Sequence, residues 1–140
     1  MCLPFSDLSE RTLEQGTHLG FLYEIVHNGN GYRCGYVRVL PGHPWFGKGY
    51  DDVGAEVHGG LTFAQAGSSC PTHGPEEEWW LGFDCAHCDD LPDPKLPGSA
   101  RMVGMLSGLR EYGAEVRSQE YARRECFRLA EQAAAAASAA

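Results

Sequence analysis

Two short segments of the sequence carry side chains that could do chemistry. Residues 57–63 read VHGGLTF and contain His58, and residues 79–87 read WWLGFDCAH and contain Asp84 and His87. Imidazole and carboxylate groups bind divalent metals and also serve as general acids and bases. His58, Asp84 and His87 are therefore the candidate catalytic residues, and the same three are candidate ligands for a divalent cation such as Zn, Mg or Mn.

Both segments alternate apolar residues with polar or small ones, which is the pattern of a strand with one buried face. If the two strands pair with their apolar faces together, His58 and Thr62 would lie beside Asp84, on the face that the helices leave free. The glycines in both segments would then either bend the sheet or let a ligand approach the backbone.

The segment 42–54 holds further candidates. Its glycines and prolines predict an irregular loop, yet it is rich in aromatic and ionisable residues. Trp45 and Phe46 either close the open end of the sheet or form one wall of a pocket. The candidate ligand-binding residues, from this loop and from the strands, are His43, Trp45, Tyr50, Asp51, Thr62, Trp80 and Arg38.

The sequence contains six cysteines. Because no signal peptide is recognisable at the N-terminus, we expect these thiols to be reduced. Cys70 with His73, and Cys85 with Cys88, have the spacing of the ligand pairs in a small zinc knuckle. The alternative is that the thiols bind no metal, as is common for buried cysteines.

Composition narrows the choice of partner. The chain of 140 residues is long enough for one domain with its own core, and no apolar run approaches the length of a membrane span. The net charge of -8, from 19 acidic and 11 basic residues, argues against a nucleic-acid partner. We expect a cytoplasmic protein that binds neither nucleic acid nor membrane. The sequence does not determine its oligomeric state and is compatible with a homo-oligomer.

The segments before and after the candidate residues should form the strands and helices that position them. Residues 21–27 and 32–40 are rich in β-forming residues, and the Asn-Gly-Asn-Gly segment at 28–31 suits a hairpin turn. Residues 6–15 resemble a short helix with capping-box spacing at its start. Ser99 could cap another helix.

The C-terminal helix is predicted from its start and from one apolar stripe. Ser118 can cap it, after a short extended segment at Val116. A stripe at helical spacing should pack on the sheet, and it consists of Ala122, Cys126, Leu129 and Ala133. The Ala-rich tail at 133–140 has helix propensity but no evident packing partner, so we expect it to be frayed or disordered.

Strands followed by helices indicate an α+β fold. We expect an antiparallel sheet of about four strands with the C-terminal helix packed on one face, in a single domain over residues 1–132. The other face would remain partly open, and a concave surface below the loop 42–54 is the expected binding site.

Several of these motifs together resemble a family of small proteins found in phages and bacteria. The resemblance covers residues 32–90 and the last helix, and its motifs are GHP at 42–44, YDD at 50–52, VHGGLTF at 57–63 and WWLGFDCAH at 79–87. It brings no assigned catalytic residues. It implies a phage setting, in the host cytoplasm, and there a protein that binds or destroys a small nucleotide signal of host defence.

Three functions are consistent with these residues. In the first, a His/Asp/aromatic pocket sequesters a nucleotide-like small molecule, with a ring stacked on a base and Arg38 on a phosphate. In the second, the bound metal makes the protein a hydrolase or phosphodiesterase acting on such a nucleotide. In the third, the protein has no small-molecule site and His58 hydrogen-bonds to Asp84 inside the fold. The sequence has no phosphate-binding loop, GxSxG or HExxH motif to decide between them.

Overall fold

The predicted hairpin forms the centre of the main sheet. β2 (Phe21–His27) and β3 (Arg33–Val39) pair antiparallel along their length. In the connecting turn, the backbone N–H of Asn28 donates to the carbonyl of Tyr32 at 2.9 Å. Gly29 takes a φ of 87°, which glycine adopts without steric cost. The local turn chemistry therefore fixes this part of the fold.

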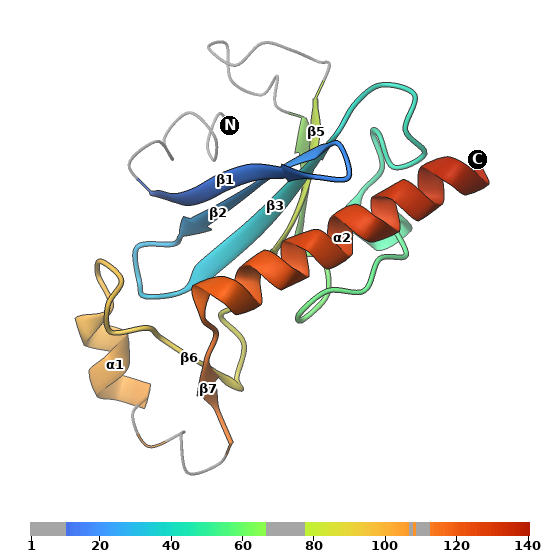
Figure 1. Ribbon diagram of the computed structural model, residues 1–140. Coiled ribbons are helices and arrows are strands. Elements are labelled where there is room, and N and C mark those ends of the chain that lie inside the picture. The colour runs from blue at the N-terminus through green and yellow to red at the C-terminus, as the bar shows by residue number, and fades with distance from the viewer. Residues whose placement is uncertain (1–10, 67–77, 107, 109–112) are drawn as a thin grey trace.

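Five antiparallel strands make up the main sheet, in the order β1-β2-β3-β5-β4 (Figure 1). The computed structural model describes residues 11–66, 78–106, 108 and 113–140. The strands added to the hairpin are β1 (Thr12–His18), β5 (Trp79–Asp84) and β4 (Phe63–Ala66). The predicted α+β fold is confirmed, with five strands where about four were expected.

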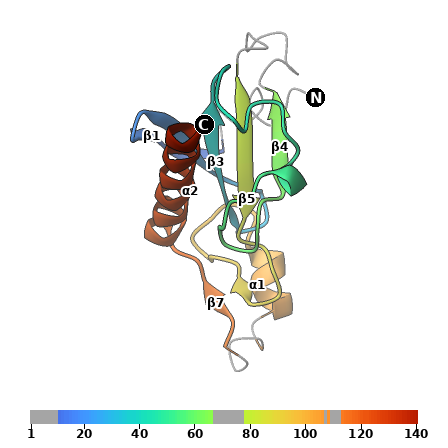
Figure 2. The same ribbon diagram turned by 90° about the vertical axis from the view of Figure 1, so that its right-hand side faces the viewer.

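The long C-terminal helix, α2 (Gln119–Ala139), covers one face of this sheet (Figure 2). Ser118 caps it as predicted, because its Oγ accepts a hydrogen bond from the backbone N–H of Tyr121 at 3.1 Å. All four residues of the predicted stripe are fully buried: Ala122, Cys126, Leu129 and Ala133. The stripe that the sequence identifies is therefore the side of α2 that packs on the sheet.

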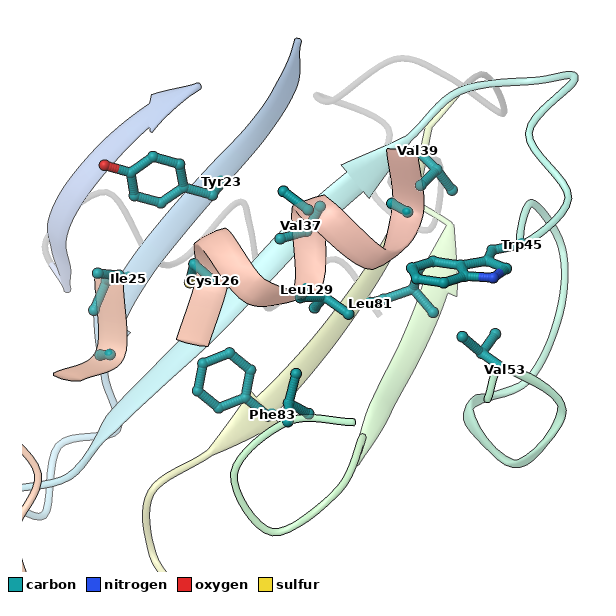
Figure 3. Close-up of a cluster of buried hydrophobic side chains, with 14 of the residues drawn as sticks. Tyr23, Ile25, Val37, Val39, Trp45, Val53, Leu81, Phe83, Cys126 and Leu129 are labelled. Atoms are coloured by element: carbon teal, nitrogen blue, oxygen red, sulfur yellow. The ribbon is translucent and has the colours of Figure 1, made fainter. Parts of the chain in front are cut away.

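The main core lies between α2 and the sheet. Leu129 of α2 packs among Val37, Leu81 and Phe83 of the central strands (Figure 3). Trp45 belongs to the same cluster and is only 8% exposed. Trp45 therefore helps to close the end of the sheet, which is one of the two roles proposed for the aromatic residues of the loop 42–54.

Two of the predicted elements are wrong. Residues 12–15, expected in a helix over 6–15, lie in β1, where pairing with β2 overrides the local helix signal; residues 1–10 lie outside the described part of the chain.

The segment 57–62 is not a strand. Gly59 and Gly60 adopt φ values of 69° and 83° and form a turn, so β4 begins only at Phe63.

A smaller substructure lies beyond one end of the main sheet, next to the N-terminus of α2 (Figures 1 and 2). It contains α1 (Ala100–Leu106) and a two-stranded parallel ribbon of β6 (Asp90–Leu91) and β7 (Glu115–Val116). The helix after Ser99 and the extended segment at Val116 are confirmed. A short 3-10 helix, η1 (Tyr50–Asp52), lies in the loop between β3 and β4.

The Ala-rich segment at 133–140, expected to fray, continues α2 as far as Ala139. Ala133 is fully buried against the sheet and Ala136 packs at the edge of the same core, which gives the segment the packing partner that the sequence did not indicate. None of the described helices combines the length and the hydropathy of a membrane-spanning segment.

The face of the sheet opposite α2 is not the open polar surface that was expected. Val26, Cys34 and Trp80 point to it and are buried, Trp80 being only 4% exposed. A Cβ atom at Gly82 would overlap the ring of Tyr36 on this face, so close packing accounts for that glycine.

Candidate metal site at Asp90

A buried carboxylate, Asp90, is the centre of a cluster of polar side chains. Its Oδ2 lies 2.8 Å from His58 Nε2 and 3.2 Å from His87 Nδ1, and it also accepts the backbone N–H of His87 at 2.9 Å. Its Oδ1 accepts a hydrogen bond from Arg117 Nε at 2.6 Å. The Asp90 side chain is completely buried, so these partners replace the water that an ionised carboxylate requires.

His58 is delivered by the turn that precedes β4. The backbone N–H of Gly60 donates to the Val57 carbonyl at 2.9 Å and closes the turn. Gly59 has the positive φ that a type II turn requires at its third residue. A Cβ atom at Gly59 would also overlap the ring of His87. Glycine at this position therefore lets the two imidazoles approach each other, with ring centroids 5.4 Å apart.

Asp90 and Arg117 meet because β6 pairs with β7. In this parallel ribbon Asp90 lies opposite Glu115, and Arg117 follows β7 directly. Arg117 also forms ion pairs with Glu115 at 3.0 Å and with Asp89 at 3.3 Å. Its guanidinium carbon lies 5.2 Å from the ring centre of Tyr121, a separation at which a cation and an aromatic face attract each other.

His58 faces the N-terminal part of α2. Its Nδ1 lies 2.6 Å from the hydroxyl of Tyr121, and its backbone N–H donates to Glu125 Oε1 at 2.7 Å. The side chain is only 8% exposed. The prediction that His58 and Asp84 emerge together on the helix-free face is therefore wrong, because the glycine turn directs His58 toward α2.

Asp84 lies at the outer side of the cluster. Its Oδ1 is 3.8 Å from His87 Nε2, and its Oδ2 accepts a hydrogen bond from Thr62 Oγ1 at 3.2 Å. The predicted proximity of Thr62 and Asp84 is thus confirmed. His87 lies between two carboxylates, with Nδ1 toward Asp90 and Nε2 toward Asp84.

The geometry of the cluster suits a metal ion. One ligand atom from each of His58, His87 and Asp90 lies within 4.8 Å of the other two. In a tetrahedral zinc site, ligand atoms are separated by roughly 3.3 to 3.5 Å. The distances from Asp90 Oδ2 to the two imidazoles, 2.8 and 3.2 Å, are slightly shorter, so an ion would fit after an outward shift of roughly half an ångström.

The environment keeps Asp90 in the form that binds metal. Burial alone would raise the pKa of this carboxyl, but hydrogen bonds from Arg117, from His58 and from the His87 backbone outweigh burial and lower the pKa below its ordinary value. The carboxylate is therefore ionised at neutral pH. Its charge is balanced by Arg117, whose own pKa is raised, chiefly by the hydrogen bond to Asp90.

A cavity of about 560 Å³ opens beside His87 and Asp90. Its polar and ionisable lining residues are Asn28, Asn30, Tyr32, His87, Cys88 and Asp90, and its apolar ones are Ala86, Met102 and Leu106. A small molecule in this space would contact the cluster through His87, which is 31% exposed.

The other predicted ligand-binding residues lie away from this cluster. Arg38 forms an ion pair with Glu78 at 2.8 Å, and Trp80 donates its Nε1–H to the same carboxylate at 3.3 Å. His43 Nε2 lies 2.8 Å from the Ala133 carbonyl. Arg38 and His43 line a second, smaller cavity of about 260 Å³.

Tyr50 and Asp51 belong to η1, where both are exposed. The structure therefore does not gather the seven predicted ligand-binding residues into one pocket. Thr62, through Asp84, is the member that reaches the Asp90 cluster.

The predicted zinc knuckle stays a prediction. Cys70 and His73 lie outside the described residues. Cys85 and Cys88 are free thiols, the first buried and the second exposed. Burial, followed by the nearby charge of Asp90, raises the pKa of Cys85, which keeps it protonated in this environment.

Sequence reasoning missed three members of the cluster, namely Asp90, Arg117 and Tyr121. Asp90 had one usable signal, since it follows His87 by three residues and both could point to one site. Arg117 had no such signal in the sequence, because its proximity to Asp90 depends on a ribbon of two residues per strand.

Comparisons with protein-family models, with curated proteins and with solved structures each found no match. The functional inference depends on the geometry of the site.

Proposed function

We propose that this protein binds one divalent transition-metal ion, with zinc as the best fit, through His58, His87 and Asp90, and that it is a metal-dependent hydrolase. The observation that carries the proposal is the convergence of two imidazoles and one ionised carboxylate, from the turn at His58 and from the segment 87–90, to within 4.8 Å. Two histidines and one carboxylate, with the remaining position open to water, are a common ligand set of catalytic zinc.

Each proposed ligand also has an outer partner. The Tyr121 hydroxyl contacts His58 Nδ1 at 2.6 Å, and Arg117 donates to the second oxygen of Asp90 at 2.6 Å. Asp84 approaches His87 Nε2 at 3.8 Å. Such partners fix the tautomer and orientation of metal-binding side chains, which is their usual function in metal sites.

The cavity beside His87 supports a catalytic role. A bound divalent ion lowers the pKa of a coordinated water to about 7 and polarises a substrate oxygen. Hydrolysis would join the water oxygen to the acyl carbon or phosphorus of the substrate, break the bond to the leaving group and transfer the water proton to that group. The space of about 560 Å³ leaves room for a small substrate.

The nucleotide-like ligand and the action on a host-defence signal stay predictions of the sequence. The residues proposed for them have other contacts: Trp45 and Trp80 are buried, and Arg38 is paired with Glu78. These contacts favour the metal site over a stacking pocket as the centre of function.

The proposal is tested by measuring metal content and hydrolysis together. After equilibration with zinc and removal of unbound metal, elemental analysis should find about one zinc per chain. Asp90→Asn should lose it, whereas Asp89→Asn, at a carboxylate that is 62% exposed, should retain it. The zinc-loaded protein should hydrolyse at least one member of a panel of esters, amides and phosphodiesters, and chelator-treated protein should not. Absence of stoichiometric zinc, or equal zinc in the two variants, would overturn the metal site.

A further inference from the structure

Tyr32 is a buried polar side chain in the wall of the cavity beside Asp90. The residue is 7% exposed and lines the cavity together with His87 and Asp90. Its described hydrogen bonds are made by its backbone, whose N–H donates to Asn28 Oδ1 at 3.3 Å and whose carbonyl accepts from the Asn28 N–H at 2.9 Å. Within the part of the chain that the structure describes, its phenol hydroxyl has no hydrogen-bond partner.

A buried hydroxyl without a partner is costly, and native proteins rarely retain one without a reason. The cavity supplies the reason, because a molecule bound there can accept this hydrogen bond. Burial, and then the charge of Asp90, raise the pKa of Tyr32, so the hydroxyl keeps its proton and is available as a donor at neutral pH.

The charges around the cavity indicate which kind of oxygen Tyr32 would meet. Among the described lining residues there is no lysine or arginine. Three guanidinium groups near the cavity already have partners: Arg117 pairs with Asp90, Arg33 pairs with Asp93 at 2.9 Å, and Arg11 Nη1 donates to the Asn28 carbonyl at 3.3 Å. Apart from the proposed metal ion, the described lining residues would offer a phosphate group none of the cationic side chains that usually bind it.

An uncharged carbonyl compound meets these conditions, because it needs no cationic side chain in the lining. Its oxygen can accept from a neutral phenol, and its apolar substituent can pack against Met102 and Leu106, which also line the cavity.

We infer that Tyr32 is the substrate-binding hydrogen-bond donor of this site, and that the substrate is an uncharged amide or ester whose carbonyl oxygen accepts from Tyr32. The inference rests on the proposed metal site. In the hydrolysis of such a compound, the water oxygen bonds to the carbonyl carbon, the C–N or C–O bond breaks, and the amine or alcohol leaves with a proton. Tyr32 strengthens its hydrogen bond as negative charge develops on the carbonyl oxygen.

The test uses protein loaded with cobalt in place of zinc, so that ligand binding changes the visible spectrum of the metal. The two probes are acetohydroxamate, which presents a carbonyl oxygen, and inorganic phosphate. Acetohydroxamate should bind the wild type more tightly than phosphate does. Tyr32→Phe should weaken acetohydroxamate binding about tenfold, the factor expected for one hydrogen bond, while its cobalt content stays at one per chain. Tyr50→Phe, at an exposed tyrosine of η1, should bind like the wild type.

The outcomes separate the two proposals. If cobalt and zinc fail to bind at all, the metal site itself is wrong and the role of Tyr32 fails with it. If the metal binds but Tyr32→Phe and Tyr50→Phe bind acetohydroxamate equally well, only the role of Tyr32 is overturned. Tighter binding of phosphate than of acetohydroxamate would overturn the amide or ester assignment.

Discussion

His58 Nε2 lies 2.8 Å from Asp90 Oδ2, although 32 positions separate the two residues in the sequence. One comes from a glycine turn ahead of β4 and the other from the two-residue strand β6. Their contact joins the main sheet to the small ribbon at the N-terminus of α2. A metal ion at this contact would therefore hold together segments that unfolding separates.

Zinc should stabilise the folded protein. Because the three ligands converge only in the native state, bound metal shifts the folding equilibrium by mass action, by about 2.7 kcal/mol at a free zinc concentration one hundred times the Kd. Thermal melts with zinc should give a higher Tm than melts with EDTA. In Asp90→Asn the two melts should coincide, and an equal zinc-dependent shift in that variant would contradict the assignment of Asp90 as a ligand.

Asp84→Asn should weaken metal binding without unfolding the protein. Asp84 lies 3.8 Å from His87 Nε2 and is 34% exposed, so its expected role is to orient His87. Loss of an outer partner of this kind typically reduces metal affinity by about 10- to 100-fold, whereas a partly exposed substitution changes stability by about 0.5 kcal/mol. Competition with a chromophoric chelator measures the zinc affinity, and Asp51→Asn in η1 is the matched control. An unchanged affinity would remove Asp84 from the site.

Gly59→Ala should disturb both the turn and the cluster. The residue has a φ of 69°, and its added Cβ would overlap the ring of His87. We expect a loss of about 1 to 3 kcal/mol in the free energy of unfolding, measured by urea denaturation, together with weaker zinc binding. Gly54→Ala is the control, since a Cβ there meets open space. Equal stabilities of the two variants would mean that the turn does not need a glycine at 59.

The sequence predicts those parts of the fold that short-range signals determine. The hairpin of β2 and β3 follows from its Asn-Gly turn, and the buried side of α2 follows from the spacing of Ala122 and Leu129. His58 was placed on the wrong face because the segment 57–62 alternates like a strand. Its two consecutive glycines with positive φ instead form a turn.

The site itself depends mainly on contacts between segments that lie far apart in the sequence. Asp90 precedes a proline-rich segment and resembles a solvated loop residue, yet its side chain is completely buried. Arg117 reaches it across 27 positions, through a ribbon with two paired residues per strand. The residue types of the site could therefore be recognised at His58 and His87, whereas for Asp90 the sequence offered only its spacing of three residues from His87.

The pH dependence of stability should reveal a second, partly buried cluster, where Glu14 of β1 meets Arg123 of α2. Glu14 accepts hydrogen bonds from Arg123 Nε at 2.6 Å, from the Tyr23 hydroxyl at 2.7 Å and from Gln119 Nε2 at 3.0 Å. The hydrogen bond from Arg123 is the main cause that lowers the pKa of Glu14 from 4.5 to about 2, against the opposing effect of burial. The folded state therefore holds this proton less tightly than the unfolded chain does.

The sign of the effect follows from that difference. The stabilisation by Glu14 is fully present above pH 4.5 and is lost as the pH falls from about 4.5 to about 2. Urea denaturation across this range should show a steep decline in the free energy of unfolding for the wild type and a shallower one for Glu14→Gln. Glu56→Gln, at a side chain that is 82% exposed, should follow the wild type. If Glu14→Gln declined as steeply as the wild type, the contact between β1 and α2 would not be the source of acid sensitivity.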